Sequence, residues 1–152
     1  MYLPSRYTIV SGAGSSQYAL VAFDNALRHA GIGDYNLVKV SSILPPNCEY
    51  RKKIDAEKGS IVFAAYSSAT INDVGKIFTT AVAVAIPQNI TESGVIFEYS
   101  SECENTEDAT RDMCCEGMKN RDRIYSEIKS SAITIHSESG KYVSAISAIV
   151  MW

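Results

Sequence analysis

The chain has 152 residues, of which 46% are hydrophobic and 20% charged, and a formal net charge of −3. This is the size of one soluble domain that buries a core without metal or disulfide staples, and its acidic balance argues against nucleic acid as a main partner. Because no apolar run approaches the roughly 20 residues of a membrane span and the N-terminus does not resemble a signal peptide, we expect a cytoplasmic protein with no membrane partner.

The apolar pattern alternates between strand-like and helix-like segments. In chain order, we predict a strand at residues 6–10, a helix at 17–30, strands at 36–44, 60–70, 79–86 and 94–99, a helix at 107–119, and strands at 132–136 and 142–151. The glycines of SGAGSS, residues 11–16, should break the first strand, and Ser15 or Ser16 should cap the helix. The alanines of residues 79–86 also permit a helix. The order predicts one sheet-rich α+β domain over residues 1–152, with its helices packed outside.

The predicted strand at residues 36–44 contains two adjacent serines near its end, Ser41 and Ser42. It is followed directly by Pro45 and Pro46. Prolines stiffen this segment, since they fix φ and restrict the preceding residue. A serine hydroxyl held against the preceding carbonyl can attack its own amide bond. The resulting ester can undergo β-elimination to dehydroalanine, which hydrolyses to a pyruvoyl group and ammonia. Spacing alone favours a plainer interpretation, in which both serines are ordinary strand-end residues.

Four segments resemble the pyruvoyl-dependent arginine decarboxylase family. They are residues 22–46 (AFDNALRHAGIGDYNLVKVSSILPP), 59–68 (GSIVFAAYSS), 81–89 (AVAVAIPQN) and 94–101 (GVIFEYSS), with a looser match at 111–117 and in the terminal AISAIVMW. The segment N-x-x-x-x-S-S-I-x-P-P is the most specific, because the family's cleavage lies within its serine pair. The resemblance implies that Ser41 ends a β fragment, residues 1–41, and that Ser42 becomes the pyruvoyl group at the start of an α fragment, residues 42–152.

The same resemblance implies a four-layer αββα sandwich and a homotrimer of cleaved protomers, with active sites between subunits. It implies conversion of L-arginine to agmatine and CO2 through a Schiff base on the pyruvoyl group, which serves as the electron sink. Glu98 lies in an apolar strand and matches the family's catalytic glutamate, the general acid. Burial would raise the pKa of this carboxyl and keep it protonated. From the residues alone, a solvent-facing strand residue is an equal alternative.

Five further residues match positions with a role in the family. Asn36 matches the asparagine tied to self-processing and the substrate pocket, and its amide can donate to an oxyanion. Asp24 matches the aspartate at the guanidinium end of the substrate, where a carboxylate accepts two parallel hydrogen bonds. Leu20, Gly33 and Ile43 match pocket-lining positions, although core packing explains Leu20 equally well.

Some features depart from the family or stay outside its site. The loop SGAGSSQYAL is serine-rich where relatives often carry acidic residues, and Tyr35 replaces a residue that is usually smaller. We interpret His29 and His136 as structural or surface residues. The cysteines form no CxxC pair, so we expect no metal site and favour free thiols, although spacing alone leaves one disulfide open. The cysteines are Cys48, Cys103, Cys114 and Cys115.

Three alternative functions remain open at this stage. The same chemistry could act on another amino acid such as lysine, ornithine or histidine, since Asp24 suits any cationic end. An uncleaved, non-enzymatic oligomeric paralogue would carry the same fold. A serine hydrolase with Ser42 as nucleophile is the weakest alternative, because the chain lacks a G-x-S-x-G elbow and a recognisable histidine partner.

Overall fold

The computed structural model describes residues 1–152 and contains two β-sheets and two helices. The elements are β1 (Arg6–Ser16), α1 (Ala19–His29), β2 (Asn36–Lys39), β3 (Ile43–Leu44), β4 (Glu49–Tyr50), β5 (Ile61–Ile71), β6 (Ile77–Pro87), β7 (Gly94–Ser101), α2 (Thr106–Lys119), β8 (Tyr125–His136) and β9 (Tyr142–Met151). The strand order is β2-β5-β9-β1-β4 in the first sheet and β3-β7-β6-β8 in the second.

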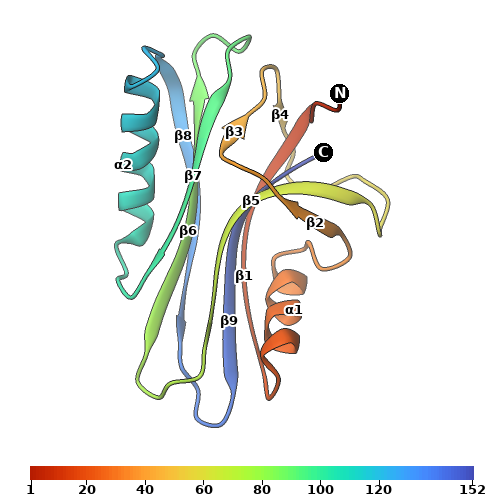
Figure 1. Cartoon of the computed structure of the whole chain (residues 1–152), viewed down its shortest axis with the longest axis vertical. Helices are drawn as coiled ribbons and strands as arrows, with labels where there is room; N and C mark the ends of the chain where they lie inside the picture. Colours follow the sequence, from red (N-terminus) through yellow and green to blue (C-terminus); the bar gives the residue numbers. More distant parts are fainter.

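The two sheets face each other, and each carries one helix on its outer side. Helix α1 packs on β1 and β9, and α2 packs on β6, β7 and β8. Figure 1 shows the resulting layers, with α2 at the left, α1 at the right and the sheets between them. The α+β class and the four-layer αββα sandwich are therefore confirmed.

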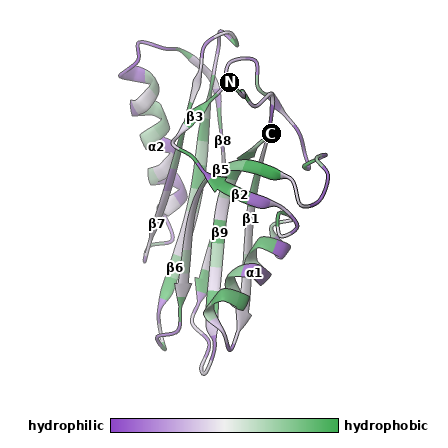
Figure 2. Ribbon diagram, turned by 45° about the vertical axis from the view of Figure 1, so that its right-hand side comes forward, coloured by the Kyte–Doolittle hydropathy of each residue, from purple (hydrophilic) through white to green (hydrophobic).

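Strand β6 illustrates why these residues form a strand between two layers. Val82 and Val84 pack into the core between the sheets, whereas Ala81, Ala83 and Ala85 alternate with them and face the α2 side. This period of two is the strand period, and the small alanines let α2 lie close to the sheet. In Figure 2 the hydrophobic colour recurs along the central strands, and the loops at their ends are mostly hydrophilic.

Strand β1 does not break at the glycines. It continues through SGAGSS to Ser16 and pairs with β9 along its length, so the predicted break and cap are wrong. The glycines have a packing role instead, because α1 lies directly on them. A Cβ atom on Gly12 would lie 2.5 Å from the Ala30 nitrogen, and one on Gly14 would lie 2.6 Å from the Ala26 nitrogen. Helix α1 begins at Ala19 without a side-chain cap.

A Gly12→Ala substitution tests this close approach. We expect it to lower the free energy of unfolding by about 1–3 kcal/mol, because the added methyl overpacks the contact between β1 and α1. Urea denaturation followed by circular dichroism measures the change. Ser15→Ala, on the same strand, is the matched control and should stay within about 0.5 kcal/mol. Equal stability of Gly12→Ala and the wild type would contradict the packing argument.

The predicted strand at residues 36–44 is two strands in different sheets. β2 runs parallel to β5 in the first sheet, and β3 runs antiparallel to β7 in the second. The chain crosses from one sheet to the other at residues 40–42, as Figure 1 shows. The serine pair therefore lies on an inter-sheet crossover and not at the end of one strand. Two smaller differences from the prediction concern β4 and β8. No strand was expected at β4, in the polar stretch 49–58, and β8 begins earlier than the predicted strand at 132–136.

Candidate active site

Backbone hydrogen bonds anchor the crossover at both ends. At the first end, the Val40 amide donates over 3.1 Å to the carbonyl of Ala64, a residue of β5 in the first sheet. At the other end, the Ser42 carbonyl accepts a hydrogen bond over 2.9 Å from the amide of Ile96, a residue of β7 in the second sheet. The Ser41–Ser42 peptide bond is therefore held between two rigid sheets.

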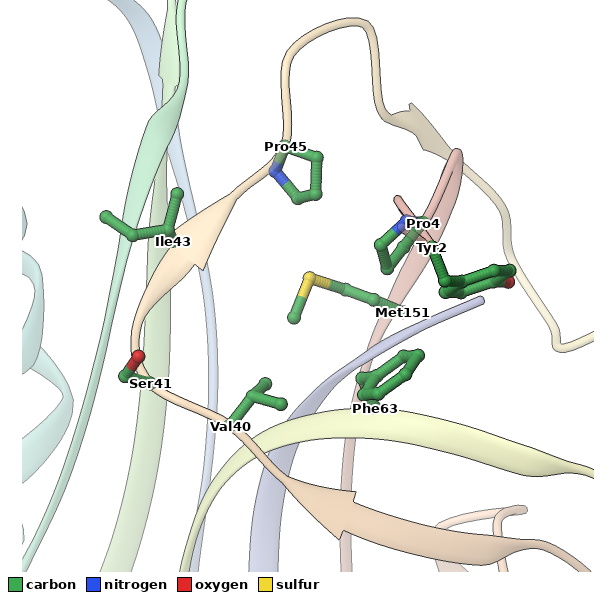
Figure 3. A pocket seen from close by; sticks show the side chains of 8 residues that line it. All are labelled: Tyr2, Pro4, Val40, Ser41, Ile43, Pro45, Phe63 and Met151. Atoms are coloured by element: carbon green, nitrogen blue, oxygen red, sulfur yellow. The ribbon is translucent and has the colours of Figure 1, made fainter.

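The side chains of the crossover point in alternate directions. Ser41 and Ile43 face an apolar pocket of about 220 Å³, which Figure 3 shows from close by. The other lining residues are Tyr2, Pro4, Val40, Pro45, Phe63 and Met151. Ser42 points away from this pocket, and its Oγ donates to Oε2 of Glu98 over 3.2 Å. The two serine side chains thus point in different directions, and only that of Ser42 meets the carboxyl.

Glu98 lies on β7 opposite Val82, on the strand face that looks toward the first sheet. It is half-buried, and burial raises the pKa of its carboxyl. The hydrogen bond from Ser42 and the positive charge of Lys39 oppose this rise. Burial dominates because it penalises the charged form more than the two contacts favour it. The sequence-based expectation of a raised pKa for Glu98 agrees with this environment.

A second pocket, of about 370 Å³, opens beside Glu98. It is lined by Lys39, Tyr66, Ser67, Ser68, Glu98, Tyr99 and Ser100. The Lys39 Nζ lies 4.6 Å from the centre of the Tyr66 ring, a cation–π arrangement. Neither Lys39 nor Tyr66 is predicted from the sequence, since no local pattern reveals that β2 pairs with β5. Their positions place one cation and one carboxyl in the same pocket.

The remaining predicted site residues lie elsewhere in the protomer. Leu20 is 84% exposed and Asp24 is exposed, both on α1, which covers the outer face of the first sheet. Gly33 packs against a side chain of α1. Asn36 begins β2, and its Nδ2 donates to the Gly59 carbonyl over 2.7 Å. None of these four residues lines the Glu98 pocket or hydrogen bonds to Ser42 or Glu98.

The other reactive groups do not assemble into a site. All four cysteines are free thiols. His29 accepts a hydrogen bond at Nδ1 from the Ala13 amide over 3.0 Å, which ties it to the packing of α1 on β1. The structure contains no group of three or more His, Cys, Asp or Glu side chains that could hold a metal ion. Neither helix is long and apolar enough to cross a membrane.

Comparison with known proteins identifies the class to which this fold and site belong. Residues 6–152 match the family model described as "Pyruvoyl-dependent arginine decarboxylase (PvlArgDC)". The chain is similar to the pyruvoyl-dependent arginine decarboxylase of Methanococcus aeolicus, with 36% identity over 98% of this chain and 90% of the relative. It is 33% identical to that of Methanocaldococcus jannaschii, over 99% and 91%. It is 41% identical to pyruvoyl-dependent arginine decarboxylase 1 of Methanosarcina acetivorans, over 70% and 67%.

The protein is thus an enzyme of the carboxy-lyase class whose cofactor is a covalently bound pyruvoyl group. The chain belongs to the pyruvoyl-dependent arginine decarboxylase family. The residues present fit that cofactor, because the serine from which it would form is present in the chain. Ser42 is held at a fixed crossover, and its hydroxyl already contacts the half-buried carboxyl of Glu98.

Proposed function

We propose that this chain cleaves itself between Ser41 and Ser42 and that the processed enzyme converts L-arginine to agmatine and CO2. The observation that carries the proposal is the hydrogen bond from Ser42 to Glu98 at the crossover, in a chain of this family. The products of cleavage are a β fragment, residues 1–41, and an α fragment, residues 42–152. Asn36 lines neither pocket of the single protomer, so its proposed part in processing depends on assembly with other subunits.

Self-cleavage begins when the Ser42 Oγ attacks the carbonyl carbon of Ser41. A C–O bond forms, the amide C–N bond breaks, and the Ser42 nitrogen takes a proton, which gives an ester. In the uncleaved chain the hydrogen bond from Ser42 favours the ionised carboxyl of Glu98, which is the form that can accept the hydroxyl proton. Elimination then removes the Cα proton of residue 42 as the Cβ–Oγ bond breaks, and leaves the Ser41 carboxylate and dehydroalanine at position 42. Hydrolysis releases ammonia and leaves the pyruvoyl group.

In decarboxylation, the pyruvoyl group supplies the electron sink that withdraws the electron pair left by CO2. Glu98 supplies the proton that replaces CO2 on the α-carbon of the substrate. Its burial between the sheets favours the protonated carboxyl, which is the form that a proton donor requires. The pocket beside it, which Tyr66 and Tyr99 help to line, is large enough for the reacting end of an amino acid.

Variants of Lys39 test the proton-donor role of Glu98 through the pH dependence of the activity. As a proton donor, Glu98 is active while protonated, so activity falls as the pH rises through its pKa. The charge of Lys39 lowers that pKa, and Lys39→Met should raise it. We expect the alkaline limb of the pH–rate profile to move to higher pH, with up to about tenfold more activity retained at a fixed pH on that limb. Lys39→Arg keeps the charge and should keep the wild-type midpoint. An unmoved limb in Lys39→Met would contradict the role of Glu98.

We propose further that the enzyme is a homotrimer whose sites form between subunits. Asp24 would bind the guanidinium end of the substrate through two parallel hydrogen bonds, with Leu20, Gly33, Asn36 and Ile43 around it. Support comes from the exposure of Asp24 and Leu20 on the surface of a single protomer, away from Ser42. A neighbouring subunit can bring such residues to the pyruvoyl group.

The net charge of −3 and the small pocket suit a cytoplasmic enzyme with an amino acid substrate and no nucleic acid or membrane partner.

Intact-mass analysis of the denatured protein tests the cleavage. Two fragments that break between Ser41 and Ser42, with a carbonyl in place of the new amino group, are expected. Turnover of arginine, lysine, ornithine and histidine then tests the substrate, and arginine should be preferred. One unbroken chain without decarboxylase activity would support the uncleaved, non-enzymatic alternative instead.

Complementation between two inactive variants tests the shared site. Asp24→Asn and Glu98→Gln are each expected to be nearly inactive as homotrimers. Co-expressed, they form mixed trimers in which some sites combine an intact Asp24 from one subunit with an intact Glu98 from the next. Recovery of a measurable fraction of wild-type activity is expected. No recovery in mixed trimers, or a monomer by sedimentation, would contradict the intersubunit site.

A further inference from the structure

The crossover contains a turn centred on the nucleophile. The Ile43 amide donates to the Ser41 carbonyl oxygen over 3.1 Å. A hydrogen bond between residues two apart defines a γ-turn, here with Ser42 at its centre. The carbonyl that accepts this bond belongs to the peptide bond between Ser41 and Ser42.

This carbonyl oxygen is the atom that becomes negatively charged during self-cleavage. When the Ser42 Oγ bonds to the Ser41 carbonyl carbon, the electron pair of the C=O bond moves to the oxygen. Donors already aimed at such an oxygen stabilise the transition state, because they need no reorganisation as the charge develops. In the structure, the Ile43 amide is the only hydrogen-bond donor to the Ser41 oxygen, and the Asn36 amide is bound to the Gly59 carbonyl.

We propose that the backbone N–H of Ile43 is an oxyanion donor in the self-cleavage of this chain, held in place by the γ-turn at Ser42. The inference rests on the proposed self-cleavage and adds a catalytic group to it. The bond changes are those of the acyl shift. The Oγ–C bond forms as Glu98 takes the hydroxyl proton, the oxyanion rests against the Ile43 N–H, and the C–N bond breaks as the nitrogen is protonated.

The surroundings of Ile43 explain why this donor stays in position. Ile43 pairs with Val95 of β7, and the Ser42 carbonyl is fixed by the Ile96 amide. Ile43 is followed by Leu44, which is buried in the core between the sheets, and then by Pro45. The turn is therefore clamped on its C-terminal side by β7 and the core, so that the N–H keeps its aim at the Ser41 oxygen.

Replacement of a single backbone amide by an ester tests the proposal. The α-hydroxy acid analogue of isoleucine at position 43 removes the N–H and keeps the side chain. Time-resolved intact-mass analysis of the full-length precursor follows cleavage and locates the break, which separates it from hydrolysis of the new ester. We expect self-cleavage to slow by about 10²–10³-fold, the usual effect of removing one oxyanion donor.

The same replacement at position 96 is the matched control. It removes the N–H that binds the Ser42 carbonyl, a neighbouring carbonyl that is not attacked. Both esters lose one backbone hydrogen bond at the same turn, so thermal unfolding should show similar losses of stability. The position 96 ester should slow cleavage far less than the position 43 ester. Unchanged cleavage of the position 43 ester, or equal slowing by both, would overturn the inference. An intact wild-type chain would contradict the proposed function itself, before the esters are compared.

Discussion

A Ser42→Ala variant is expected to remain one chain of 152 residues, with no carbonyl at position 42 and no decarboxylase activity. The hydroxyl is the nucleophile of cleavage and the source of the pyruvoyl group, so its loss removes both steps at once. We expect activity to fall at least about a thousandfold. Intact-mass analysis under denaturing conditions and the release of CO2 from labelled arginine measure the two effects. The fold should persist, since the variant loses one hydrogen bond worth about 1 kcal/mol.

Ser41→Ala is the control for this variant. The Ser41 side chain faces the apolar pocket and makes no hydrogen bond to Glu98, so cleavage should continue at the same peptide bond. Loss of cleavage in Ser41→Ala to the same extent as in Ser42→Ala would contradict the assignment of Ser42 as the single nucleophile. Cleavage of Ser42→Ala at position 41 would contradict the mechanism altogether.

A Glu98→Gln variant is expected to slow both self-cleavage and turnover, each by about 10²–10³-fold. Glutamine keeps the size of the side chain and can still accept the hydrogen bond from Ser42, but it cannot take or give a proton. Pulse-labelled precursor followed by mass gives the cleavage rate, and activity per cleaved protomer gives the turnover. Glu104→Gln, at an exposed residue, is the control and should change neither rate.

The wild type and Glu98→Gln should also differ in how their thermal stability depends on pH. Burial raises the pKa of Glu98 in the folded state above its ordinary value of 4.5, so the native state holds the proton more tightly than the unfolded state. The stabilising contribution is complete below that ordinary value and is lost as the pH rises through the folded pKa. We expect the wild-type Tm to fall relative to that of Glu98→Gln over this range. A constant difference in Tm would contradict the burial argument.

Particular residues show how far the sequence predicted the structure. The apolar run at residues 79–86 predicted a strand, although its alanines also permitted a helix, and β6 is that strand. The glycines of SGAGSS were interpreted as a break because glycine is common in turns. In the fold, Gly12 and Gly14 are needed where α1 approaches β1, a contact that local sequence does not reveal. Residues 36–44 are predicted as one strand, but their first part pairs in one sheet and their last part in the other.

By itself, the sequence determined the chemistry that the chain carries. The serine pair before two prolines, the carboxyl of Glu98 in an apolar strand and the family resemblance follow from the order of residues. Only the tertiary structure decided which serine meets that carboxyl. Ser42 and Glu98 are 56 residues apart, and they meet because β3 pairs with β7 while β2 stays in the other sheet. Contacts of this kind depend on long-range strand pairing, which the local preferences of a segment do not encode.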